Sequence, residues 1–304
     1  MAASSIPSAG LDREPRAEAA DVRPRASFGR RFLRRLWRNK VALVATVVLA
    51  VIILACAFAP LITHQSPNTQ NLLNQLNGPS PGHPLGMDEL GRDELARLLY
   101  GGRLSIMIGL FGAVFGMVSG VIIGGVMGYV GGWLDMVLGR VLDIFLSFPG
   151  ILLAILLAAF LGPGIKTVMV ALTIWFMPIF ARIVRGSVLQ LREMEYVAAA
   201  RAVGSSGGRA LFRHILPNTL DAVIVNFTLS AAASILIEAA LSFLGLGVQP
   251  PTAEWGAMVE SAKQYLQQDP MIVFYPGLAI FVTVMSINLL GDVLRDVLDP
   301  KMVD

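Results

Sequence analysis

Residues 195–218 read EYVAAARAVGSSGGRALFRHILPN, and this stretch decides how the fold of the whole chain is interpreted. The stretch is polar and basic, although the sequences on both sides of it are apolar enough to span a bilayer. Residues 188–203 are rich in helix formers. We predict that a short helix there ends in the glycine-rich run 204–208, because glycine reaches backbone angles that other residues avoid. Residues 209–215 are expected to form a second helical piece, which Pro217 ends.

Two short helices with a glycine elbow, placed between two membrane spans, allow two interpretations. In the first, the elbow is a rigid projection that docks into a groove of a partner protein, where alanine and glycine permit close approach of the backbones. In the second, the stretch is an ordinary loop between spans that its arginines anchor at the membrane surface. Composition by itself leaves both interpretations open.

The composition is that of a protein that crosses the membrane several times. Of 304 residues, 55% are hydrophobic and only 15% are charged, whereas a soluble domain carries about a quarter charged residues. The mean hydropathy is +0.67. The arginines cluster beside apolar runs rather than along a soluble face, which argues against nucleic-acid binding. The single cysteine, Cys56, cannot form a disulfide within the chain.

The N-terminal part divides into a polar tail, a basic segment and a first span. Residues 1–28 lack periodicity and are expected to be a disordered cytoplasmic N-terminus. Residues 29–40 interleave arginines with Phe32, Leu33 and Trp37, a pattern typical of an amphipathic helix at an anionic membrane surface. Residues 41–61 are predicted to be the first span, since the apolar run is too long for a signal peptide and no small-residue cleavage site ends it.

Residues 62–103 form a long polar segment that is expected to lie outside the cytoplasm. It is rich in proline, glycine and asparagine, and its charges between residues 83 and 97 are of mixed sign. We interpret these charges as a solvated loop followed by a short helix. His83 is not expected to bind a metal, because no second histidine or cysteine stands at ligand spacing.

The remaining spans follow from apolar runs of about 20 residues in a core of residues 104–294. They are predicted at residues 104–130, 136–161, 167–184, 222–244 and 271–290, with an inner loop at 185–221, an outer loop at 245–270 and a cytoplasmic tail at 291–304. Glycines recur every three or four residues along 104–130, which favours close helix packing in lipid. Pro149 is expected to kink the third span near its start, and Asp143 is expected to pair with Arg140.

One carboxylate, Glu238, lies within the fifth predicted span. A charged residue in a span is costly and usually faces the bundle interior or water. Counting 1.5 Å per residue places it about 24 Å from Ala222, towards the outer side. Two roles are open: a structural partner for polar groups at a subunit interface, which we favour, or part of the wall of a transport pathway.

The distribution of positive charge gives the orientation. Six spans place both termini on one side of the membrane. The basic N-terminus and the arginine-rich inner loop then lie on the same face, as the positive-inside rule requires for both. The sequence therefore predicts a protein that crosses the membrane several times and has both termini in the cytoplasm.

Several separated motifs, within a region of about residues 31–301, resemble the ABC-importer permeases of the dipeptide, oligopeptide and nickel family, C-type subunit, and this resemblance implies a location in the bacterial cytoplasmic membrane. The outer motif is His-Pro-Leu-Gly-x-Asp-x-x-Gly-Arg-Asp, formed by His83, Pro84, Leu85, Gly86, Asp88, Gly91, Arg92 and Asp93. The second is the stretch around Glu238, IEAALSFLGLG, and the ending GDVLRDVLDP is similar to that of the family.

The third motif, in residues 195–218, resembles the EAA loop, through which the ATPase subunit of these importers grips the permease. The resemblance implies an ATPase-coupling role for Glu195, Ala198, Ala199, Ala200, Arg201, Gly204, Ile215, Leu216 and Pro217. The sequence departs from the family pattern at Ala198, where a glutamate is usual, and in the isoleucine, which is shifted by one position. Glu195 lies three residues before Ala198.

The resemblance implies an all-α type I permease with six transmembrane helices. It also implies a homologous B-type permease as partner, two ABC ATPase subunits, an extracytoplasmic binding protein, and a peptide or other small solute as substrate. The chain itself has no phosphate-binding loop and no catalytic cluster, so ATP and magnesium are expected on the partner ATPases and no cofactor on this chain. A secondary transporter or channel of similar topology is the alternative.

Overall fold

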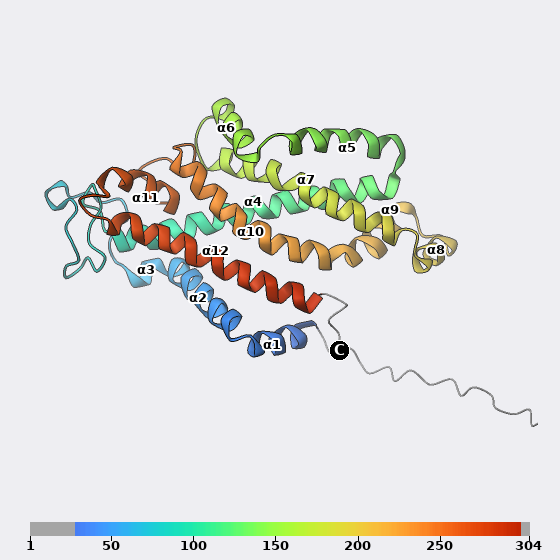
Figure 1. The fold of residues 1–304 in the computed structure, drawn as a ribbon, viewed down its shortest axis with the longest axis horizontal. Helices are drawn as coiled ribbons and strands as arrows, with labels where there is room; N and C mark the ends of the chain where they lie inside the picture. The colour runs from blue at the N-terminus through green and yellow to red at the C-terminus, as the bar shows by residue number, and fades with distance from the viewer. Residues whose placement is uncertain (1–27, 299–304) are drawn as a thin grey trace, which may run out of the picture.

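The computed structural model describes residues 28–298, and the fold it shows is an elongated bundle of helices (Figure 1). The predicted disordered N-terminus and the last residues of the predicted tail therefore lie outside the described residues. The segment 63–93 and helix α11 (Trp255–Ala262) lie at one end, which we call the loop end. Helices α8 (Glu195–Ala202) and α9 (Gly207–Arg209) lie at the other end, which we call the elbow end.

The chain enters the bundle through a basic helix. Helix α1 (Phe28–Arg38) is followed by α2 (Lys40–Ala57) and by the short α3 (Ala59–Ile62). The side chain of Asn39 accepts a hydrogen bond from the backbone N–H of Ala42 at 3.1 Å, so it caps α2 and separates it from α1. Leu36 of α1 packs with Val293 and Val297 of α12 (Met271–Leu298), which holds the basic helix against the bundle.

The centre of the bundle is the pair α4 (Glu94–Val130) and α7 (Ile165–Leu191). The glycines predicted to pack closely are the contact surface: Gly112 faces Leu172, Gly116 faces Phe176, and Gly120 faces Phe180. A methyl group added at Gly120 would lie 2.5 Å from the Phe180 Cβ, so only glycine allows the two backbones to come this close. The packing predicted from the glycine spacing is confirmed.

The third predicted span is split into two helices. Helices α5 (Gly132–Ser147) and α6 (Gly150–Leu161) are bent by 92° relative to each other. Pro149 lies between them, in the middle of the predicted span rather than near its start, and it has no N–H to continue a helical ladder. By length and hydropathy, the described residues contain five helices that could cross a membrane, or six if the bent pair is one span.

The elbow end contains more helix than the sequence suggests. Helix α7 continues to Leu191, so the first part of the helix predicted over 188–203 belongs to α7, and α8 is a separate helix. After α9, a π-helical turn (Ala210–Ile215) and a 3-10 turn (Leu216–Thr219) lead directly into α10 (Leu220–Phe243). The prediction that Pro217 ends a helix is wrong: it lies in the first turn of the 3-10 segment, where its missing N–H costs no hydrogen bond.

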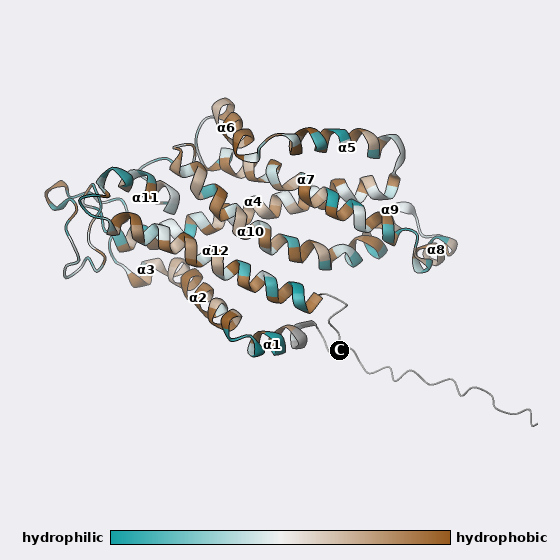
Figure 2. Ribbon diagram, viewed as in Figure 1, coloured by the Kyte–Doolittle hydropathy of each residue, from teal (hydrophilic) through white to brown (hydrophobic). Residues whose placement is uncertain are grey.

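Short elements complete the loop end. A 3-10 turn spans Leu72–Asn74, and another, Lys263–Tyr265, follows α11 before α12. Hydropathy follows this architecture: hydrophilic residues are frequent in α1, α8 and the loop end, while α2 and α6 are mostly hydrophobic (Figure 2). The described residues form no β-strand, only two isolated bridges, Ser80 with His83 and Met87 with Asp93.

Candidate functional sites: the elbow and the buried polar networks

Helix α8 ends at Gly204 in a Schellman motif. Gly204 has φ +87°, and its N–H donates to the carbonyl of Arg201 at 2.9 Å. The next N–H, of Ser205, donates to the carbonyl of Ala200 at 3.0 Å. The break predicted at this glycine is confirmed, and its cause is the left-handed backbone conformation that glycine adopts without strain.

The elbow is held to the bundle on its inner side. Val197 and Ile215 are fully buried and belong to the same hydrophobic cluster as Val188 of α7. The guanidinium of Arg201 lies 5.3 Å from the ring centre of Tyr129, near the end of α4. The side chain of Asn218 donates to the His214 carbonyl at 2.6 Å. These contacts hold the two helical pieces against the spans.

The other side of the elbow is exposed, since this chain does not cover it. Most of the residues to which the resemblance gives an ATPase-coupling role are exposed: Glu195, Ala198, Ala199, Arg201, Gly204 and Pro217. Ala200 and Leu216 are half-buried, and Ile215 is buried. Val203 and Phe212, which do not belong to the predicted site, are also exposed, at 86% and 60%. In the sequence, these two residues stand out as apolar side chains within a polar stretch, which is the pattern that could have indicated an exposed apolar surface.

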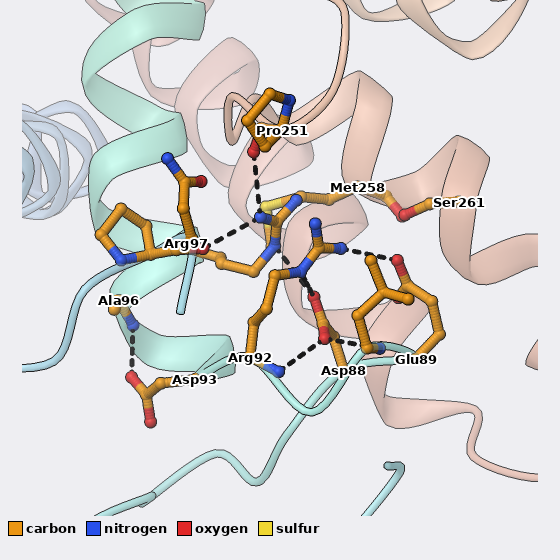
Figure 3. A network of polar contacts seen from close by, with 12 residues as sticks. Asp88, Glu89, Arg92, Asp93, Ala96, Arg97, Pro251, Met258 and Ser261 are labelled. Atoms are coloured by element: carbon orange, nitrogen blue, oxygen red, sulfur yellow. Dashed lines mark hydrogen bonds and ion pairs between the residues drawn. The ribbon is translucent and has the colours of Figure 1, made fainter. Parts of the chain in front are cut away.

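At the loop end, the outer motif is a buried ion-pair network (Figure 3). The carboxylate of Asp88 receives Arg92 Nε at 2.5 Å and Arg97 Nε at 3.1 Å. A second nitrogen of Arg92 donates to Glu89 at 2.7 Å. All four side chains are at most 9% exposed. The prediction of a solvated loop is wrong here, because the charges are paired with one another and removed from water.

The same motif also starts helix α4. The Asp93 carboxylate caps it by accepting the Ala96 N–H at 2.7 Å, and its other oxygen lies 2.8 Å from His83 Nδ1. Gly86 and Gly91 have φ +85° and +66°, and a methyl group at Gly91 would overlap the carbonyl oxygen of Asn71. Pro84 is exposed, and His83 and Leu85 are half-buried, while the other residues of the motif are buried.

Arg97 joins the buried ion-pair network to two segments that are distant in the sequence. One of its terminal nitrogens donates to the carbonyl of Pro67 at 3.1 Å and reaches that of Pro251 at 3.5 Å (Figure 3). The segment before α4 and the segment before α11 therefore share one buried cation. The outer motif acts as a clamp for the loop end; it holds no group of three metal-ligating side chains, and no such group occurs within residues 28–298.

The polar group in α10, Glu238, is buried by this chain alone. Its exposure is 0%, so this chain by itself covers the side chain and the carboxyl group does not reach lipid. The two roles considered for it, at a subunit interface or in a pathway wall, stay predictions. Its neighbour is a second carboxylate, Glu254, the cap of α11. The sequence does not indicate this contact, because Glu238 lies in α10 and Glu254 caps α11.

The ion pairs nearer the elbow end also differ from the expectation. Asp143 pairs with Arg182 of α7 at 2.5 Å instead of Arg140. Arg185, one turn further along α7, makes two hydrogen bonds to Asp135, at 2.5 and 2.7 Å. These pairs attach α5 to the core through α7, which explains why α5 lies along the bundle.

Comparisons with known proteins agree with this architecture. Residues 120–304 match the family of binding-protein-dependent transport system inner membrane components. Residues 27–79 match the N-terminal transmembrane domain of oligopeptide transport permease C. A chain of the inward-facing MetNI methionine ABC transporter matches the fold with a TM-score of 0.53 at 21% identity, covering 66% of this chain and 96% of that one. The predicted all-α permease fold is thus confirmed.

Two curated relatives extend over nearly the whole chain. The dipeptide transport system permease protein of Alkalihalophilus pseudofirmus is 45% identical over 273 residues, which cover 90% of each chain. The glutathione transport system permease protein of Salmonella paratyphi A is 47% identical over 274 residues, again 90% of each. These matches set aside the alternative of a secondary transporter or channel. The chain therefore belongs to the inner-membrane components of binding-protein-dependent transport systems, as a permease subunit of the dipeptide and oligopeptide family of ABC importers.

Proposed function

We propose that this permease carries di- or oligopeptides and forms half of the translocation pathway together with a homologous B-type permease. The names of the two relatives, a dipeptide and a glutathione permease, support a small peptide as substrate over a nickel chelate. An extracytoplasmic binding protein delivers the peptide to the loop end. Uptake of a labelled dipeptide, of glutathione and of nickel by cells with and without the chain tests this choice, and uptake of nickel alone would contradict it.

Two ATPase subunits hydrolyse ATP in this proposal, one of them docked on the elbow of this chain. The observation that carries the proposal is the elbow itself. Its inner side is fixed by buried Val197 and Ile215, while Val203 and Phe212 leave apolar surface uncovered at the opposite end from the outer clamp. A groove on an ATPase would cover those side chains and would move the attached spans when it moves.

The test of coupling is Gly204→Val in the assembled complex. A β-branched residue at φ +87° is strained, so α8 would end differently and the elbow would change its angle. We expect normal membrane insertion but loss of peptide uptake and of peptide-stimulated ATP hydrolysis. Subunit stoichiometry is measured on the same sample.

The matched control is Gly132→Val. Gly132 also has a positive φ, +63°, and also has no atom near its missing Cβ, but it is the first residue of α5. It reports the effect of backbone strain outside the elbow. Full coupled activity of Gly204→Val, or an equal loss in both variants, would contradict a specific docking role for the elbow.

A further inference from the structure

The contact between Glu238 and Glu254 brings two carboxyl groups together inside the chain. Both side chains are 0% exposed. The hydroxyl of Ser242, one turn further along α10, lies beside the Glu238 carboxyl group. No cation and no backbone N–H of residues 28–298 bonds either oxygen of Glu238. A negative charge this deep without such partners is costly.

Glu254 has the donors that a negative charge requires. Its oxygens accept the N–H groups of Gly256 at 2.5 Å and Ala257 at 2.9 Å, both at the start of α11. They also accept the hydroxyl of Ser105 from α4 at 2.9 Å. Hydrogen bonds to the ionised form stabilise it, and the start of a helix adds a favourable field. Glu254 is therefore the member of the pair whose surroundings can hold a negative charge.

Among residues 28–298, no cation lies beside Glu238 to balance a second charge. The electrostatic neighbour that acts on it is Glu254, together with the neutral hydroxyl of Ser242. The nearby stretch of α4 offers the Ser105 hydroxyl, whereas Arg103 of that helix is bonded to the carbonyls of Cys56 and Ala57. On α12, Ile280 packs against Ala239 in the same cluster, and its neighbour Thr283 is uncharged.

We propose that Glu238 is a neutral carboxylic acid that donates its O–H to the Glu254 carboxylate, so the two glutamates form a binding site for one proton. Two adjacent carboxylates cannot both stay ionised away from water, and one shared proton turns their repulsion into a strong hydrogen bond.

This hydrogen bond joins three helices. Glu254 caps α11 and also bonds Ser105 of α4, and Ser105 in turn accepts the N–H of Trp255 at 3.1 Å. With the shared proton, α10 is tied into the same network. The position of α11, and with it that of the loop end, then depends on Glu238 retaining its proton.

Infrared spectroscopy of the full chain in lipid, purified with the subunits that accompany it, tests the proposal directly. At neutral pH the difference spectrum between the wild type and Glu238→Gln should show the C=O stretch of one protonated carboxylic acid, because any other protonated carboxyl group is common to both samples. The control is Glu260→Gln, since Glu260 lies on α11 but is exposed and paired with Lys263 at 2.9 Å. Its substitution should leave the acid band unchanged. An identical acid region in wild type and Glu238→Gln would overturn the proposal.

Thermal unfolding of the same samples separates a shared proton from a bound cation. The Gln amide can donate to Glu254 as the acid does, so Glu238→Gln should unfold at the wild-type temperature, while Glu238→Leu should unfold about 5 °C lower. A Glu238→Gln variant as unstable as Glu238→Leu would mean that an ionised Glu238 is needed, as in a cation site, and would refute the shared proton. Neither readout requires transport, so failure here is distinguishable from failure of the proposed function.

Discussion

Replacing Asp88 by Asn should loosen the loop end strongly, because one carboxylate neutralises two buried arginines. Asp88 receives Arg92 Nε at 2.5 Å and Arg97 Nε at 3.1 Å, and all three side chains are nearly inaccessible to water. An Asn side chain keeps one oxygen for the backbone N–H groups of Leu90 and Arg92. Its amide nitrogen, however, would face guanidinium donors and could not accept from them.

The magnitude follows from the number of bonds lost. Each hydrogen bond to a charged group contributes about 1.5–3 kcal/mol, and breaking a buried ion pair from one side costs about 3–5 kcal/mol. Arg92 retains Glu89 as a partner at 2.7 Å. We therefore expect the loss of stability of the loop end to lie in the middle of the second range, at about 4 kcal/mol. At 1.4 kcal/mol per factor of ten, the open form of the loop end becomes roughly 1,000-fold more populated.

Limited proteolysis of segment 63–93 in the intact, membrane-embedded chain measures this population, because cleavage requires local opening. The control is Glu260→Gln, which breaks a pair whose two side chains are 43% and 37% exposed, and for which we expect less than about 1 kcal/mol. If Asp88→Asn and Glu260→Gln are cleaved at the same rate, the buried network does not hold the loop end and the reasoning is refuted.

Two further predictions concern the same segment and the orientation of the chain. Gly91→Ala should raise the cleavage rate of the segment at least tenfold, because the added methyl group overlaps the Asn71 carbonyl. The control is Gly82→Ala: Gly82 also has a positive φ but has open space around it, so the loss of stability should be only about 1 kcal/mol. Equal cleavage rates in the two variants would contradict the argument from crowding. Cysteines at the exposed residues Ser80 and Ser206 should be labelled by an impermeant thiol reagent from outside and inside the cell respectively, and reversed labelling would overturn the proposed orientation.

Local features of the chain could be predicted well. The apolar runs appear as long helices because a helix satisfies its own backbone hydrogen bonds whatever surrounds it. The close packing of α4 on α7 follows from glycine spacing along one helix. The end of α8 at Gly204 follows from the backbone freedom of a single residue.

Features that depend on distant segments could not be predicted. A polar segment with charges of both signs has the same sequence pattern whether its charges are hydrated or paired with one another. Only the approach of Pro67 and Pro251 to Arg97 removes the outer motif from solvent. Likewise Pro149 indicated a kink, but the size of the bend depends on tertiary contacts. One of these is Gly150, which lies so close to the ring of Trp175 that a Cβ there would be 2.5 Å away.

The sequence by itself determined that this chain is a multi-span helical permease with a helix break at Gly204, since hydropathy, glycine spacing and family motifs are properties of neighbouring residues. Only the tertiary structure decided where the charges are buried and which groups they meet. Glu238 and Glu254 are separated by a helix end and a loop, and nothing in either local sequence indicates the other. Their contact exists because α10 and α11 pack together on α4, and burial there makes the electrostatics of the pair unlike that of either glutamate alone.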